Sequence, residues 1–203
     1  MTGSDAATEW MLPWMLDNYQ KHNDTPVTVV DFGMLSHLET RVHSIGRLET
    51  KRDTLTWLYK PGAMLNSPYR NTCWIDTDVE IKGDISGIFD NLMPEKLHMV
   101  VDRPWTKRGG NLMYNSGVVA FTGKPQILQR WAQACHERPQ RGDQETLHAM
   151  LDPLSQTINI KELNHKYNVL RLDHLDKTTP KEILVNHWTG QKGKDHIRSL
   201  INE

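Results

Sequence analysis

The sequence is poor in cysteine and has no long apolar run. Its 203 residues contain only two cysteines, Cys73 and Cys135, and each lies inside an apolar segment. Two such thiols exclude a disulfide framework and indicate buried cysteines in a reducing compartment. The longest early apolar run, residues 10–16, is interrupted by Pro13 and is too short to span a bilayer. With no secretory signal visible, we expect a soluble, cytoplasmic chain without a membrane span.

The chain also lacks a net charge of any size. Its 24 Lys and Arg residues nearly balance 25 Asp and Glu residues, so the formal charge is -1. This balance excludes bulk attraction to nucleic acid or to an anionic membrane. No internal repeat, low-complexity tract or linker is visible, and 203 residues are enough for a hydrophobic core. We therefore expect one domain over residues 1–203, while the sequence does not indicate an oligomeric state.

Short apolar strands alternate with amphipathic helices along the chain. We expect strands near residues 27–30, 73–75, 98–101, 118–121, 157–160, 169–172 and 183–185. Helices are expected near residues 11–19, 63–69, 84–92, 127–135 and 141–151. This alternation is typical of an α/β fold with a mostly parallel sheet flanked by helices. Residues 2–5 form a loop-type cluster that can open the first helix, so the first strand of such a sheet is nearly missing.

Three stretches show no clear periodicity. Residues 36–52 carry many charges and only short apolar pieces, and we expect them to be irregular. Residues 103–111 are basic and contain two glycines, which predicts a loop. Residues 186–194 follow the last strand and contain Gly190 and Gly193, which predicts a second loop.

Two carboxylates follow the strand at residues 73–75. Asp76 and Asp78 are two positions apart, so on an extended chain both side chains point to the same side. Paired carboxylates repel each other unless a positive charge lies between them, and a magnesium or manganese ion meets that need. An ordinary turn is the competing interpretation, because aspartate is common in turns.

Strand ends elsewhere support a binding crevice. The strands that end near residues 30, 75 and 101 are each followed by an aspartate: Asp31, Asp76 and Asp102. In open α/β sheets, ligands bind outside the carboxyl ends of the strands. A row of carboxylates at these ends therefore predicts a polar site there.

A third set of polar residues lies near the end of the sequence. His187 follows a strand and offers a nitrogen ligand, and Lys192 and Lys194 come soon after it. Glycines allow a backbone to approach an anion closely, and lysines neutralise it, so a metal with these lysines would suit a diphosphate. Taken singly, His187 could be an ordinary core histidine and the lysines a solvated loop.

These motifs together resemble those of the nucleotide-sugar glycosyltransferases of the GT-A fold, and glycosyltransferase family 8 in particular. The matching segments, in chain order, are residues 2–5, 73–79, 85–89, 115–118, 143–145, 166–168 and 187–190. They extend over nearly the whole chain, from Thr2 to about Lys194. No single motif is decisive, but their order and spacing together are specific.

The resemblance implies transfer of a hexose from a UDP-sugar donor to an acceptor hydroxyl that the sequence does not identify. It implies that Asp76, Asp78 and His187 hold manganese (or magnesium), which stabilises the leaving UDP. Gln144 and Asp143 would act at the donor sugar. The implied donor-binding residues are Thr2, Gly3, Asp5, Lys60, Thr77, Asn115, Ser116, Gly117, Gly190, Lys192 and Lys194. With retention, Gln144 would lie near the reacting carbon; with inversion, Asp143 or Glu145 would have to act as a base.

The sequence departs from the family pattern at both ends. The nearly missing first strand puts uracil recognition in doubt. The family's lid lysine would fall at Gly193, between Lys192 and Lys194, so either lysine could meet the phosphate.

Two other functions compete with glycosyl transfer. A haloacid-dehalogenase-type phosphoryl transferase also places two aspartates after a strand, but it needs Thr or Val where Glu80 stands. A catalytically idle domain that binds sugar nucleotides would have almost the same sequence features as an enzyme.

Overall fold

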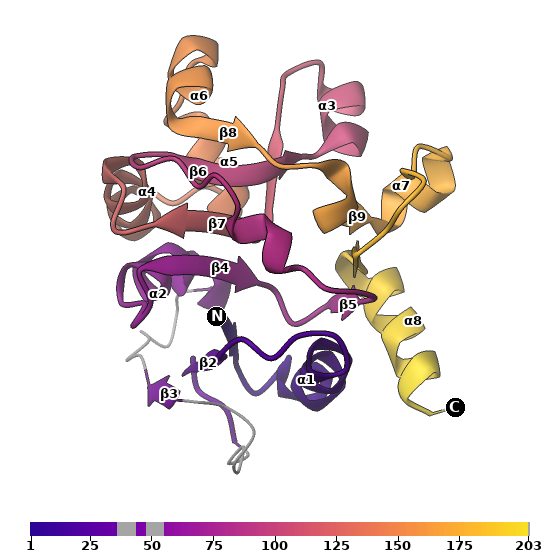
Figure 1. Ribbon diagram of the computed structural model, residues 1–203. Helices are drawn as coiled ribbons and strands as arrows, with labels where there is room; N and C mark the ends of the chain where they lie inside the picture. The colour runs from indigo at the N-terminus through magenta and orange to yellow at the C-terminus, as the bar shows by residue number, and fades with distance from the viewer. Residues whose placement is uncertain (36–43, 48–54, 203) are drawn as a thin grey trace.

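The computed structural model describes residues 1–35, 44–47 and 55–202, and a four-stranded sheet lies at its centre (Figure 1). Its strands are β4 (Asn71–Ile75), β7 (Tyr114–Thr122), β6 (Leu97–Val101) and β8 (Ile160–Glu162), in that order. β7 is antiparallel to both β4 and β6, and β8 is parallel to β6. The carboxyl ends of β4, β6 and β8 therefore meet at one edge, where the arrows of Figure 1 point to the right.

A parallel three-stranded sheet lies beside β4. It contains β1 (Thr2–Ser4), β2 (Thr28–Asp31) and β3 (Ser44–Arg47). The backbone nitrogen of Met1 donates to the carbonyl of Cys73 at 2.6 Å, and the nitrogen of Ile75 donates to the carbonyl of Met1 at 2.9 Å. These two bonds join the N-terminal strand to β4, and Figure 1 marks the N-terminus between β4 and β2.

The N-terminal sheet corrects two expectations. The loop-type cluster at residues 2–5 forms a strand, although a short one, and no helix begins there. The segment predicted to be irregular, residues 36–52, contains β3 at Ser44–Arg47, and its other residues lie outside the described part of the chain.

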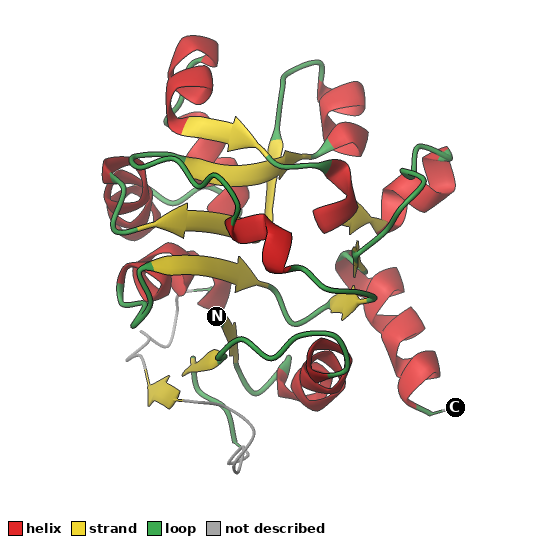
Figure 2. Cartoon of the chain, viewed as in Figure 1, coloured by secondary structure: helices red, strands yellow, loops and turns green. Residues whose placement is uncertain are grey.

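A third small sheet connects the middle of the chain with its end. β10 (Val185–His187) is antiparallel to β5 (Val79–Ile81) and parallel to β9 (Val169–Leu170). Four of the seven strand pairings in the described chain are parallel and three are antiparallel, so the sheets are mixed. Helices flank them (Figure 2), which confirms the predicted α/β class.

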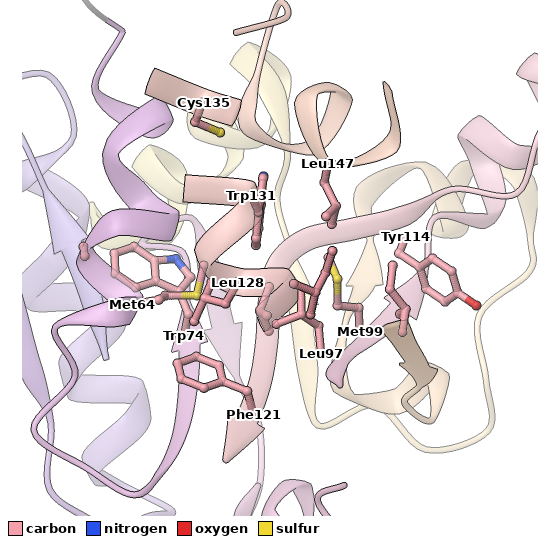
Figure 3. Close-up of a cluster of buried hydrophobic side chains, with 14 of the residues drawn as sticks. Met64, Trp74, Leu97, Met99, Tyr114, Phe121, Leu128, Trp131, Cys135 and Leu147 are labelled. Carbon is pink, nitrogen blue, oxygen red and sulfur yellow. The ribbon is translucent and has the colours of Figure 1, made fainter. Parts of the chain in front are cut away.

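Large apolar side chains fill one face of the central sheet. They lie against α2 (Lys60–Leu65), α4 (Gln126–Glu137) and α5 (Asp143–Ala149). Side chains alternate along a strand, so Trp74 of β4 and Phe121 of β7 both point to this face. Figure 3 shows this cluster, whose buried members include Met64, Trp74, Leu97, Met99, Phe121, Leu128, Trp131 and Leu147.

The other face of the sheet packs against α1 (Leu12–Gln20). Met15 and Leu16 of this helix lie in one cluster with Ile75 of β4 and Val118 of β7. Pro13 occupies the first turn of α1, where its missing N–H leaves no bond unmade. The predicted helix therefore exists, and the proline marks its start instead of kinking it.

Both cysteines are buried and free, as predicted. Burial raises the pKa of each thiol to about 12. Among residues 1–35, 44–47 and 55–202, no helix has both the length and the apolar character needed to cross a bilayer.

Several segments differ from the elements expected. Residues 103–109 form a helix, α3 (Arg103–Gly109), because Asp102 caps it and Pro104 suits its first turn. The last predicted loop is the start of α8 (Gly190–Ile201). Of the strand predicted over residues 157–160, the first three residues belong to α6 (Pro153–Asn159), and β8 begins only at Ile160. The strand predicted over residues 169–172 ends after two residues, where α7 (Arg171–Asp176) begins.

Candidate functional site

The two aspartates after β4 meet a histidine from the end of the chain. The backbone N–H of Asp76 donates to the carbonyl of Gly117 at 2.9 Å, and that of Trp188 donates to the carbonyl of Asp78 at 2.9 Å. The pairing of β10 with β5 brings His187 to the same place. One ligand atom from each of Asp76, Asp78 and His187 lies within 4.8 Å of the others.

The three side chains shift one another's pKa values in different directions. His187 Nε2 lies 3.1 Å from Asp78 Oδ1. Burial works to raise the pKa of Asp78, but the imidazole outweighs it and holds this pKa below its usual value. Burial also works to lower the pKa of His187, and the Asp78 carboxylate outweighs it and raises this pKa. The pKa of Asp76 is raised by burial and by the Asp78 charge, against the attraction of Lys60.

This group of ligands fits a divalent cation. It offers carboxylate oxygens and one imidazole nitrogen, a combination suited to manganese or magnesium. Burial and the charge of Asp78 raise the pKa of Asp76 despite the attraction of Lys60, so further positive charge between the two carboxylates would be favourable. A cation between them would supply that charge.

Lys60 is buried beneath these carboxylates. Its Nζ lies 2.8 Å from Asp143 Oδ2 and 3.3 Å from Asp76 Oδ1, and it donates to the carbonyl and hydroxyl oxygens of Ser116. Burial works to lower the pKa of Lys60, but Asp143 and Asp76 outweigh it and raise this pKa above its ordinary value. The ammonium group is therefore already surrounded by protein oxygens.

A hydrogen-bonded cluster of polar side chains lies next to this ion pair. Gln144 Oε1 accepts bonds from Asn115 Nδ2 and from the backbone N–H of Ser116, both at 3.1 Å. Gln144 Nε2 donates to Asp102 Oδ2 at 3.2 Å, and Asn115 Nδ2 donates to the same oxygen at 3.3 Å. These bonds fix the side chains of Gln144 and Asn115 on the wall of a pocket.

That pocket has a volume of about 450 Å³ and lies at the carboxyl ends of β4 and β6. All but two of the residues predicted to bind the donor or metal, or to act in catalysis, line it. They are Gly3, Asp5, Lys60, Asp76, Thr77, Asp78, Asn115, Ser116, Gly117, Asp143, Gln144, His187, Gly190 and Lys194.

Thr2 and Lys192 are the two predicted residues outside this pocket. Thr2 lines a second cavity of about 320 Å³, together with Met15 and Tyr19 of α1. Lys192 is exposed on α8, whereas Lys194 is half-buried and lines the pocket. The sequence allowed either lysine to contact a phosphate, and of the two only Lys194 lines the candidate site.

The glycines near the end of the chain serve the packing of α8. A Cβ added to Gly193 would lie 1.9 Å from the carbonyl oxygen of Trp188, so a side chain has no room there. Gly190 has φ = 73°, a conformation that favours glycine, and it begins the helix at the pocket wall. α8 therefore points its N-terminus, with the partial positive charge of its dipole, toward the pocket.

Several polar residues of this site were absent from the predicted set, and two of them, Asp102 and Asn168, make hydrogen bonds to predicted residues. Asp102 was noted only as a strand-terminal aspartate, yet it lines the pocket and binds Gln144. Asn168 is buried between Asn115 and His187. Its neighbours lie 53 and 19 residues away in the sequence, a contact that no local pattern could indicate.

The sequence matches no family model and no curated protein. Its structure is similar to those of several glycosyltransferases. The galactosyltransferase LgtC, solved with donor and acceptor sugar analogs, has a TM-score of 0.67 and 13% identity over 99% of this chain and 94% of its own. The glycosyltransferase GlyE of Streptococcus pneumoniae has a TM-score of 0.67 and 16% identity over 94% of this chain and 54% of its own. A glycosyltransferase involved in glycosylation of the major capsid of PBCV-1 has a TM-score of 0.64 and 13% identity over 97% of each chain. The chain therefore has the fold of structurally characterised glycosyltransferases, as its resemblance to the GT-A enzymes implied.

Proposed function

We propose that this chain is a glycosyltransferase that moves a hexose from a UDP-sugar to an acceptor hydroxyl. The observation that carries the proposal is the convergence of Asp76, Asp78 and His187 in the 450 Å³ pocket, beside Lys194 and the start of α8. A metal-ligand set next to positive charge suits a diphosphate. The glycosyltransferase fold makes a nucleotide-sugar the natural source of that diphosphate.

Asp76, Asp78 and His187 would hold a manganese or magnesium ion. When bound, the ion supplies Lewis-acid stabilisation to the charge that develops on the leaving diphosphate. Lys194 lies near enough to Asp78 to lower the pKa of that carboxyl. The same lysine, with the N–H groups at the start of α8, would bind the phosphate oxygens that face away from the metal.

The donor sugar would lie against Asn115 and Gln144. Asp102 accepts a hydrogen bond from each amide and so fixes both; the second N–H of Gln144 Nε2 would be directed to a sugar hydroxyl. Gly3, Asp5 and Thr77 line the same pocket and would contact the nucleoside. Asp5 accepts bonds from Thr8 and from Thr56, which makes this end of the pocket rigid.

The ion pair with Lys60 bears on the choice of a catalytic base. A general base must offer a free lone pair to the acceptor hydroxyl, and Asp143 Oδ2 lies 2.8 Å from the Lys60 ammonium. We infer that Asp143 holds Lys60 in place and helps to shape the donor-sugar site through Gln144, its neighbour in α5.

The test is a transfer assay with UDP-hexoses and a panel of hydroxyl acceptors, in manganese and in EDTA. The proposal is supported if at least one UDP-hexose releases UDP in manganese and does not do so in EDTA. Tight, metal-dependent binding of UDP-sugars without hydrolysis or transfer would favour the idle binding domain. Absence of both binding and turnover across the panel would contradict the proposed donor class.

A further inference from the structure

Asn168 lies between the metal-ligand group and the proposed donor-sugar site. It immediately precedes β9 and is only 1% exposed. Its Nδ2 donates to Asn115 Oδ1 at 2.9 Å, and its Oδ1 lies 3.0 Å from Nδ1 of His187. Both polar atoms of this buried amide are therefore used, one toward each part of the pocket.

The direction of these bonds follows from groups that cannot exchange their roles. The backbone N–H of Gly117 can only donate, and it donates to Asn115 Oδ1 at 2.9 Å. An ionised Asp102 can only accept, and it faces Asn115 Nδ2 at 3.3 Å. The side-chain amide of Asn115 is thereby fixed, with its oxygen turned toward Asn168.

The same reasoning fixes Asn168 and then His187. Because Asn115 Oδ1 accepts, Asn168 must present its NH₂ group to it, and its own oxygen must face the imidazole. That oxygen can only accept, so Nδ1 of His187 carries a proton. In the neutral ring the lone pair then lies on Nε2, the atom directed at Asp78.

Gly117 also gives the ring its space. A Cβ added there would lie 2.0 Å from Cε1 and 2.5 Å from Nδ1 of His187. The imidazole therefore packs directly on the backbone of β7, with Asn168 on one side and Asp78 on the other.

We propose that Asn168 is a positioning residue that keeps Nδ1 of His187 protonated and so makes Nε2 the atom available to a metal. The role in metal binding rests on the proposed function. The position of the proton on His187 does not, because it can be measured in protein without metal or nucleotide. A histidine ligand whose second nitrogen is held by an oxygen acceptor has a fixed orientation and greater basicity. The same series of hydrogen bonds continues through Asn115 to Gln144 and so connects the metal ligand with the proposed donor-sugar site.

The first experiment reads the tautomer by long-range ¹H–¹⁵N NMR of metal-free protein at pH of about 9, above the ordinary histidine pKa of about 6.5. The background is Asp78→Asn, because this change removes the charge that favours a protonated ring and leaves an amide that can donate or accept. His187 signals are assigned by their loss in His187→Gln. We expect the single Nδ1–H tautomer in this background and a mixture of tautomers when Asn168→Ala is added.

Two further variants complete this test. Asn168→Asp restores an oxygen acceptor and should restore the proton on Nδ1. Asn23→Ala is the matched control, because Asn23 also binds backbone groups through its amide but lies away from the pocket; it should leave the His187 signals unchanged. An Nε2–H tautomer in the background, or an unchanged Nδ1–H tautomer with Asn168→Ala, would overturn the proposal.

The second experiment measures manganese affinity in the presence of UDP by electron paramagnetic resonance of the free ion. Asn168→Ala in the otherwise wild-type chain should weaken manganese binding about 10- to 100-fold, and Asn23→Ala should not. An unchanged affinity would show that Asn168 does not support the metal. A wild-type chain that binds no manganese would contradict the proposed function, while the NMR result would still decide the role of Asn168.

Discussion

Asp143 and Asp76 share one buried ammonium group, that of Lys60, and this sharing explains why three charged side chains can lie at the bottom of a pocket. Lys60 is 3% exposed and Asp143 6% exposed, so water does little to solvate either charge. Asp78 contacts His187 instead, with Oδ1 lying 3.1 Å from Nε2 of the imidazole. Asp76 and Asp78 therefore contact different basic side chains, Lys60 and His187.

Replacement of Lys60 tests this arrangement. Lys60→Met would leave the buried carboxylate of Asp143 and the partly buried one of Asp76 without their partner, and we expect a loss of about 3–5 kcal/mol in the free energy of unfolding at pH 7. Lys166→Met is the matched control, because Lys166 pairs with a largely exposed Glu182 and its replacement should change the free energy of unfolding far less. Urea denaturation of both variants measures the difference, and equal losses would show that the buried pair has no special role.

Gln144 allows stability and turnover to be separated. Gln144→Ala removes the acceptor of Asn115 and Ser116, and about 1–3 kcal/mol of stability should be lost. If the amide acts on the sugar in the transition state, kcat should fall at least about 10-fold while the affinity for UDP stays within about 2-fold. Steady-state kinetics and calorimetry with UDP provide both values. Normal specific activity in the folded fraction would reduce Gln144 to a structural residue.

At the scale of secondary structure, α8 is the element that differs most from expectation. Its first residues were predicted to be a loop that contains two glycines, yet they form a helix whose Gly193 packs on the backbone of Trp188. The two glycines lower helix propensity and hide the helix from local patterns. α3 was missed for a similar reason, although Asp102 and Pro104 are typical of a helix start.

Gly193→Ala tests the packing of α8. The added methyl group has no space next to Trp188, and we expect a loss of about 1–3 kcal/mol with a displaced helix start. Gly62→Ala is the control, since a Cβ at this helical position meets nothing within 4 Å and should be neutral or stabilising. Thermal unfolding compares the two variants. Equal melting temperatures of the two variants would mean that α8 can move to accommodate the methyl group without loss of stability.

Lys194 and Lys192 form a matched pair on the same helix. Lys194 lines the pocket and Lys192 is exposed, so only Lys194→Ala should weaken binding of UDP with manganese. We expect a loss of about 10-fold, the effect of roughly 1.4 kcal/mol, from removal of one charge-assisted contact to phosphate. Calorimetry measures both affinities. A larger loss in Lys192→Ala would reverse the assignment of the phosphate-binding lysine.

At the scale of the whole molecule, the pocket depends on contacts between distant parts of the chain. His187 meets Asp78 across 109 residues and Asn168 meets Asn115 across 53. Sequence patterns predicted the strand that ends at Ile75 and the carboxylates after it, because both are local features. They could not show that Lys60 lies beneath those carboxylates or that Thr2 faces the second cavity, because those positions follow from tertiary packing.

The most direct test of the metal–diphosphate site is the melting temperature of the protein with manganese alone, with UDP alone and with both. Either ligand alone meets an incomplete site: manganese lacks the phosphate oxygens, and UDP brings charge to a pocket already lined by carboxylates. At ligand concentrations about 100 times the dissociation constant, binding of both should add roughly 2.7 kcal/mol to the free energy of unfolding. This corresponds to a rise of about 5–10 °C in the melting temperature for a chain of this size.

We predict that manganese and UDP together raise the melting temperature by clearly more than the sum of their separate shifts. Asp78→Ala and His187→Ala should abolish this excess, and Asp84→Ala, which removes an exposed carboxylate on the same segment, should keep it. Additive shifts in the wild-type chain, or the full excess in Asp78→Ala, would contradict a metal–diphosphate site at these residues.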